Sequence, residues 1–167
     1  MRRLRSAALC CLIVAAGSGF VGVPTGAAGS AWDGLAGWQV KQTPHGYEEL
    51  ITRLDQAVKD NKMGLVNRAS ATVGAKKALG KTIPGNMVVG VYRPDFAVRM
   101  LEASIPAGIE APIRFYVTEN ADGTATLSYR TPSAVFAPYE DSAGKLKAMA
   151  AELDVIFENI ARQASSP

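Results

Sequence analysis

Residues 86–130, NMVVGVYRPDFAVRMLEASIPAGIEAPIRFYVTENADGTATLSYR, decide the fold of this chain. At the start of this segment, Met87, Val89 and Val91 fall on one face of a strand, because successive side chains of a strand point to opposite faces. Pro94 then opens a helix, since proline suits the first helical position. The buried stripe of this helix is expected to contain Phe96, Ala97, Met100 and Leu101. The segment therefore predicts a strand that leads directly into a helix.

A β-hairpin completes the same segment. Asp122-Gly123 is a turn signal between two runs of alternating residues, which is typical of antiparallel strands joined by a tight turn. The residues expected on the core face are Ile113, Phe115, Val117, Ala125 and Leu127. The residues expected on the opposite face are Arg114, Tyr116, Thr126, Ser128 and Arg130, and Tyr92 from the preceding strand is expected to join them.

Apolar residues at helical spacing indicate two further long helices, one from Tyr47 to just before Gly64 and one over residues 142–161. Weaker patterns predict three shorter elements: strands over 38–42 and 65–72, and a helix over 74–79. Pro44 is expected to close the first of these strands. The whole pattern predicts a single α+β domain over residues 32–167, with an antiparallel sheet, the order β-α-β(n)-α, and helices packed on one face. The other face of the sheet is left free to bind something.

The first 31 residues are typical of a secretory signal peptide. Three arginines precede a mostly apolar stretch, and Pro24 and a run of small residues follow. A membrane-spanning helix needs ~20 predominantly apolar residues, whereas glycines and a serine interrupt this stretch. We therefore expect cleavage near Ala31 and a mature protein in the periplasm or outside the cell, with no membrane attachment.

Removal of this leader changes the charge of the protein. The full chain has 18 Lys and Arg residues, three of them in the leader, so that 15 remain against 15 Asp and Glu residues. A domain that binds nucleic acid needs a basic face, and the mature domain has neither net charge nor a run of like charges. The composition therefore argues against a nucleic-acid partner.

Catalytic motifs are absent from the sequence. His45 is the only histidine, and no neighbouring residue completes a catalytic or metal-binding set with it. We interpret it as an exposed loop or helix-start residue. The chain has no Gly-x-Ser-x-Gly turn, and residues 74–80 lack the spacing of a phosphate-binding loop. The sequence therefore predicts no catalytic residue, metal ligand or cofactor, and it favours a protein that is not an enzyme.

The order of several motifs resembles the bacterial family called domain of unknown function 302. These motifs are Val89 to Arg93, Pro94-Asp95-Phe96-Ala97 with Met100-Leu101, Ala111 to Val117, and Asp122-Gly123. The resemblance covers about residues 47–139. It implies a small α+β domain with a curved antiparallel sheet, similar to the TATA-binding-protein fold, that often assembles as a homodimer.

This chain departs from the family pattern at two positions. Many relatives carry a cysteine where this chain has Tyr92, and some carry another where it has Ile113. Any thiol, metal or sulfur chemistry of those cysteines is therefore not carried over. The family arginine is retained as Arg114, which preserves a group for contact with an anion or a carboxylate.

These features favour one function and leave others open. The favoured one is a non-catalytic domain that binds a small ligand or serves as an accessory domain. Its candidate ligand-binding residues are Tyr92, Arg114, Tyr116, Ser128 and Arg130 on the helix-free face. The alternatives are a haem or porphyrin carrier with Tyr92 as an axial ligand, and an enzyme that uses Tyr92 or an acidic residue made reactive by burial. The same sheet face could instead form the seam of a homodimer.

We predict that the mature amino terminus lies between about Ala28 and Trp32 and that neither Cys10 nor Cys11 carries a lipid. Intact-mass measurement of the exported protein tests this. A species that retains the leader arginines, or a lipid-modified cysteine, would show that the predicted localisation is wrong.

Overall fold

The structure is a computed structural model that describes residue 32 and residues 34–167. The predicted leader, with its cleavage site and both cysteines, lies outside the described residues. Within the described part, no helix combines the length and the apolar character needed to span a bilayer.

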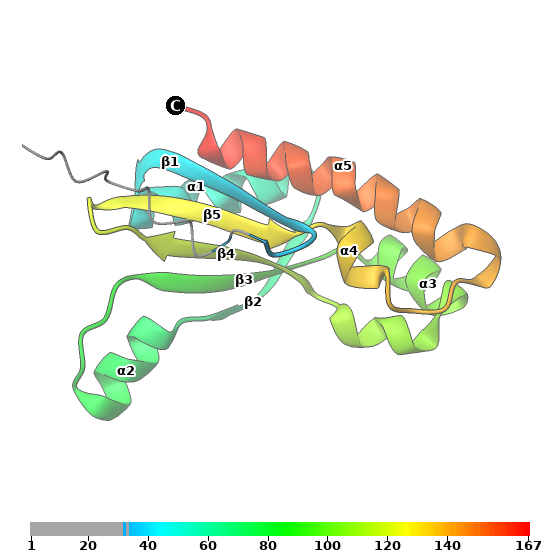
Figure 1. The fold of residues 1–167 in the computed structure, drawn as a ribbon, viewed down its shortest axis with the longest axis horizontal. Coiled ribbons are helices and arrows are strands. Elements are labelled where there is room, and N and C mark those ends of the chain that lie inside the picture. Colours follow the sequence, from blue (N-terminus) through cyan, green and yellow to red (C-terminus); the bar gives the residue numbers. More distant parts are fainter. Residues whose placement is uncertain (1–31, 33) are drawn as a thin grey trace, which may run out of the picture. The chain divides into compact units, whose positions relative to one another are not determined.

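The described chain alternates strands and helices and places all five strands in one antiparallel sheet, in the order β1-β5-β4-β3-β2 (Figure 1). The elements are β1 (Trp38–Gly46), α1 (Tyr47–Asp60), β2 (Gly64–Ala69), α2 (Ala71–Leu79), β3 (Asn86–Tyr92), α3 (Pro94–Ala103), β4 (Ile113–Glu119), β5 (Thr124–Arg130), α4 (Pro132–Phe136) and α5 (Lys145–Ser165). Short 3₁₀ turns cover Ile105–Glu110 and Ser142–Gly144. This is the predicted α+β architecture of helices packed against an antiparallel sheet.

The predicted hairpin and its two faces are confirmed. Strands β4 and β5 pair with Val117 opposite Leu127 and with Tyr116 opposite Ser128. Gly123 at the turn has a φ of 83°, a left-handed conformation that glycine adopts without strain. The five side chains expected in the core are all buried there: Ile113, Phe115, Val117, Ala125 and Leu127.

Aromatic stacking joins helix α5 to the sheet. The rings of Phe115 and Phe157 lie 4.8 Å apart at an interplanar angle of 14°, and Tyr129 packs against both. Burial raises the pKa of Tyr129, whose hydroxyl donates a hydrogen bond to Glu158 over 2.9 Å. Helix α1 packs beside α5 on the same side, as Figure 1 shows. One face of the sheet therefore carries the main core.

The first strand is longer than the sequence pattern predicted. Pro44 does not close it, because β1 continues through Pro44 and His45 to Gly46. The pairing of β1 with β5 shifts register between Thr43 and Gly46, and β1 is an edge strand. A proline is tolerated at such a place, because it lacks a backbone N–H and an irregular edge needs none there.

The stripe of α3 is narrower than expected. Phe96 and Met100 are buried and Ala97 is half-buried, but Leu101 has 47% of its surface exposed. Leu101 packs beside the following 3₁₀ turn, where its side chain lies close to Gly108. Its inclusion in the buried stripe was therefore wrong.

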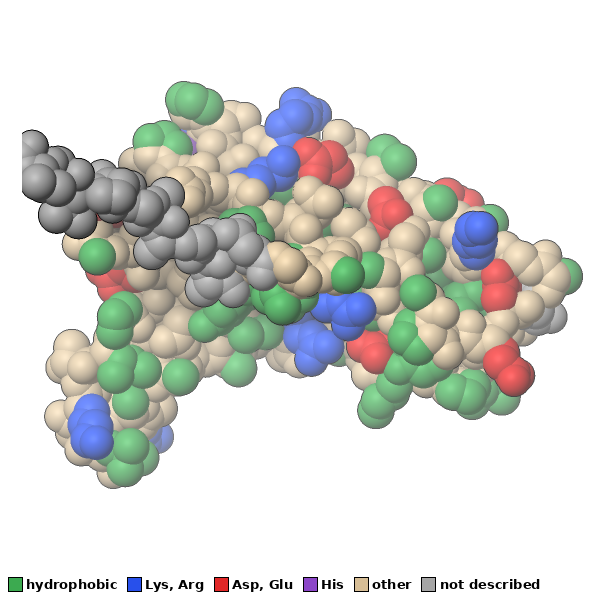
Figure 2. All heavy atoms as spheres, in the orientation of Figure 1, with side chains coloured by type: hydrophobic (Ala, Val, Ile, Leu, Met, Phe, Trp, Pro, Cys, Tyr) green, Lys and Arg blue, Asp and Glu red, His purple; other side chains and the backbone are tan. Residues whose placement is uncertain are grey.

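Helix α2 differs from the other long helices because none of its residues is buried. Ser70 caps its start by accepting a hydrogen bond from the Val73 amide, and Gly80 ends it in a left-handed conformation. In Figure 1 the helix projects away from α1 and α5, and Figure 2 shows hydrophobic and lysine side chains on the surface of this projection. The hydrogen bonds that join α2 to the rest of the domain lie at its start, where Ala71 and Thr72 bind Asn86 and Thr72 binds the Pro84 carbonyl.

The core assignment makes a prediction about stability. Replacing Phe115 or Leu153 by Ala should lower the free energy of unfolding by about 2–5 kcal/mol, because each change leaves a cavity in a packed core. Urea denaturation measures this. The matched control is Val155→Ala on the exposed side of α5, where the expected change is within about 0.5 kcal/mol. Equal effects at Leu153 and Val155 would contradict the assignment of faces.

Candidate functional site

A groove of about 650 Å³ lies on the face of the sheet opposite α1 and α5. Strands form its floor, and the start of α2 with the two residues before it forms one wall. Its lining includes Trp38, Ala71, Asn86, Val88, Glu110, Arg114, Tyr116 and Arg130. The volume falls within the range of about 300–1,000 Å³ that is typical of small-molecule sites.

The strand register brings two arginines together on the floor of the groove. Arg130 of β5 lies opposite Trp38 of β1, and Arg114 of β4 lies opposite Gly90 of β3. Continuing the β4–β5 pairing by one further pair puts Arg114 next to Arg130. The four residues thus form one row across the sheet, with two cations at its centre and an aromatic ring at one end.

The next row is aromatic and apolar. Tyr116 lies between Val88 on β3 and Ser128 on β5. The ring of Trp32 lies 5.1 Å from that of Trp38 and 6.3 Å from that of Tyr116. Three aromatic rings therefore gather beside the arginine pair.

The two arginines have different partners. Arg114 Nη2 lies 3.7 Å from Glu110 Oε2, while Glu110 Oε1 accepts a hydrogen bond of 2.5 Å from the Tyr139 hydroxyl. This hydrogen bond raises the pKa of Tyr139. Arg130 Nη2 donates to the backbone oxygen of Ala134 over 2.9 Å, and no carboxylate among the described residues forms an ion pair with Arg130. The groove therefore carries more positive than negative charge.

The structure brings together three of the five predicted site residues and places the other two elsewhere. Arg114, Tyr116 and Arg130 line the groove together. Ser128 belongs to the same face, but it is fully buried and its hydroxyl donates to the Tyr116 carbonyl over 3.4 Å. It therefore supports the floor and does not face a ligand.

Tyr92 lies outside the groove. It lines a separate small cavity beside α3. A Cβ atom on Gly90 would lie 2.0 Å from the side-chain oxygen of Asn67 and 2.8 Å from Pro112, so these two side chains cover the sheet between Tyr92 and Arg114. Strand alternation alone could not reveal this cover.

The sequence patterns did not predict several other residues that line the groove. Trp38 joins the groove because β1 pairs with β5, a contact between segments far apart in the chain. Glu110 comes from the 3₁₀ turn before β4, and Asn86 is held by Thr72 at the start of α2. No local pattern marks these residues, because their positions depend on the order of strands in the sheet.

Comparison with known proteins identifies the family. Residues 39–164 match the family described as domain of unknown function DUF302. The chain belongs to the DUF302 family. A crystal structure of an uncharacterized conserved DUF302 protein from Bacillus stearothermophilus is similar, with a TM-score of 0.67 and 19% sequence identity, over 77% of this chain and 98% of that chain. At this identity the likeness shows the fold alone. The curated proteins include no match to the chain.

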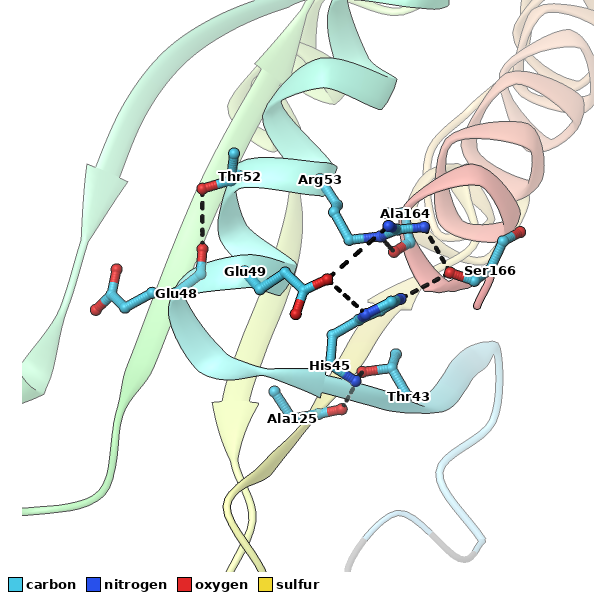
Figure 3. Close-up of polar contacts among 9 residues, drawn as sticks. All are labelled: Thr43, His45, Glu48, Glu49, Thr52, Arg53, Ala125, Ala164 and Ser166. Carbon is cyan, nitrogen blue, oxygen red and sulfur yellow. Dashed lines mark hydrogen bonds and ion pairs between the residues drawn. The ribbon is translucent and has the colours of Figure 1, made fainter.

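This DUF302 domain contains a second polar cluster, around His45 (Figure 3). The interpretation of His45 as an exposed residue was wrong, because only 7% of its surface is exposed. Strand β1 carries it under the C-terminal end of α5. Its Nδ1 lies 2.9 Å from Glu49 Oε1, and its Nε2 lies 2.7 Å from the Ser166 carbonyl oxygen. Both ring nitrogens are therefore engaged.

Arg53 extends this cluster. Its Nη2 donates to the Ser166 carbonyl over 2.5 Å and its Nε donates to the Ala164 carbonyl over 3.0 Å. The last carbonyls of a helix lack partners within the helix and carry partial negative charge, so donor side chains stabilise that end. The His45 cluster thus joins β1 and α1 to the end of α5. Among the described residues, no group of three or more His, Cys, Asp or Glu side chains is arranged to hold a metal ion.

The His45 cluster gives a prediction for this DUF302 domain. His45→Ala should lower the free energy of unfolding by about 1–3 kcal/mol, because it removes a buried side chain that contacts both Glu49 and the Ser166 carbonyl, and Arg53 alone then donates to that carbonyl. Glu49→Gln should lower it by a smaller amount, since Glu49 is more exposed. Glu48→Gln is the matched control, because the Glu48 carboxylate points away from the cluster in Figure 3. Chemical denaturation measures these free energies. Equal stabilities of His45→Ala and Glu48→Gln would contradict the role of His45 in joining β1 to the end of α5.

Proposed function

We propose that the mature chain is an exported, non-catalytic domain that binds a small organic molecule in the groove on the face of the sheet opposite α1 and α5. The observation that carries this proposal is the groove itself, which combines an apolar aromatic surface with a few polar groups that converge on it. Ligand sites in proteins have this composition, because apolar walls provide affinity and a few polar groups fix orientation. The leader predicted over residues 1–31 supports export.

The chemistry of the groove favours binding over catalysis. Its described lining contains one carboxylate, Glu110, and that group already contacts Tyr139 and Arg114. A general base must be free to reach the proton that it removes. His45 belongs to a different part of the domain, where both of its nitrogens are engaged. These contacts suit a site that holds its ligand unchanged.

Two substitutions that fill the groove test this function. Val88→Trp places a large ring on the floor, and Ala71→Trp places one on the exposed wall, where the risk to folding is lower. Each variant is produced in the native organism and purified from the cell envelope. The small molecules that it retains are identified by mass spectrometry. We expect both variants to lose a compound that the unmodified protein retains.

Val98→Trp on the exposed side of α3 is the matched control and should retain the compound. Light scattering and thermal unfolding of each variant establish the oligomeric state and the folding. A compound still held by Ala71→Trp, or no retained compound in the unmodified protein, would contradict the proposal. Dissociation of a dimer by Ala71→Trp with the compound still bound would identify the groove as a dimer seam, and Soret absorbance of the purified protein would indicate a haem carrier.

A further inference from the structure

We propose that the ligand of the groove is a planar, largely apolar molecule with one oxyanion group, a carboxylate or a phosphate, bound between Arg114 and Arg130. This inference rests on the proposed function and assigns its ligand class. The acid group lies in the arginine row of the sheet, and the apolar body lies over the adjacent row of Tyr116 and Val88.

The arginine pair is the first reason. Side chains directly opposite each other on neighbouring strands have Cβ atoms about 4.5–5.5 Å apart, and like charges in such a pair destabilise the sheet. Arg114 and Arg130 form such a pair by extension of the β4–β5 register. One carboxylate, that of Glu110, approaches Arg114 at 3.7 Å and is shared with Tyr139, and Arg130 pairs with none among the described residues. An anion between the two guanidinium groups removes this repulsion.

The accessible N–H donors of the two guanidinium groups are the second reason. Arg130 is held by one bond from Nη2 to the Ala134 carbonyl, and a guanidinium group has five N–H donors in all. Four of these donors are not used by that bond. Arg114 is 61% exposed, so its donors are also accessible from the groove. The planar fork of a guanidinium group matches the two oxygens of a carboxylate or a phosphate.

The position of the aromatic residues is the third reason. Tyr116 and Val88 lie two residues along their strands from Arg114 and Gly90, which places them about 7 Å away. This spacing is close to the length of a fused pair of aromatic rings with its acid group. Trp38 lies opposite Arg130 in the arginine row and lines the same groove. A ligand with its acid at one end and its ring system along the strands meets both rows at once.

The third row sets the neutral end of the site. Asn86 lies opposite Thr118, and its amide already binds Thr72 and the Ala71 amide. Neither residue is charged, so nothing in this row competes with the arginines for the acid group. The charge of the groove therefore selects one orientation of the ligand.

Three matched probes test the ligand class by isothermal titration: 2-naphthoate, 2-naphthyl phosphate and the neutral 2-naphthamide. We expect at least one of the two anions to bind about tenfold or more tightly than the amide, because hydrogen bonds to charged groups are the stronger ones. The ratio between the two anions shows whether the site suits a carboxylate or a phosphate. Raising the salt concentration should weaken the binding of the anions more than that of the amide.

Arg114→Gln and Arg130→Gln identify the groups that bind the acid. Each variant should weaken the binding of the preferred anion about tenfold or more and change the binding of the amide less than about twofold. Arg99→Gln is the control, because Arg99 is an exposed arginine of α3 that pairs with Glu152 away from the groove. Thermal unfolding of all three variants verifies that they are folded.

The outcomes separate this inference from the proposed function. If the two anions and the amide bind equally, the oxyanion assignment is wrong. It is also wrong if none of the three probes binds although Ala71→Trp has lost the native compound. In both cases the proposed binding function stands. If the preferred anion binds the two groove variants as well as it binds Arg99→Gln, the assignment is also wrong. If the native compound stays bound to Ala71→Trp, the proposed function itself fails.

Discussion

The stacked rings of Phe115 and Phe157 fix which face of the sheet the helices cover. Phe115 sits in β4, so its contact with α5 determines the direction of every other side chain in that strand and, through pairing, in its neighbours. A shift of one residue would turn the apolar set outward and bring Arg114 and Tyr116 into the core. The register is therefore set by burial on one face, and the chemistry of the opposite face follows from it.

Strand β5 is buried along most of its length on both sides, including Ser128 on the side of the groove. Because β5 is also paired on both edges, this part of the floor is expected to be rigid. Adjacent arginines on such a floor are held in place at some cost in stability, and departures of this kind from the usual rules are expected at sites of function.

Local patterns predicted the parts of the fold that depend on neighbours in sequence. The hairpin could be identified because alternation and the Asp122-Gly123 turn agree, and α5 could be identified from its apolar stripe. The interpretation of His45 as exposed was wrong, and Trp38 was missed as a residue of the groove. The surroundings of these two residues come from α5 and β5, which are distant from them in the chain. Of the candidate site, alternation could predict a shared face for Arg114, Tyr116 and Arg130. It could not predict that Ser128 is covered or that Asn67 and Pro112 separate Tyr92 from the groove.

The start of helix α2 gives the groove one wall. A nine-residue helix is short enough to be marginal by itself, and no buried side chain couples this one to the core. Its opening should therefore require far less free energy than global unfolding of the domain. The groove is lined by the start of this helix, and that end is tied to β3, because Asn86 accepts a hydrogen bond from the Ala71 amide and donates one to Thr72. The wall of the groove is therefore expected to keep its place when the remainder of α2 opens.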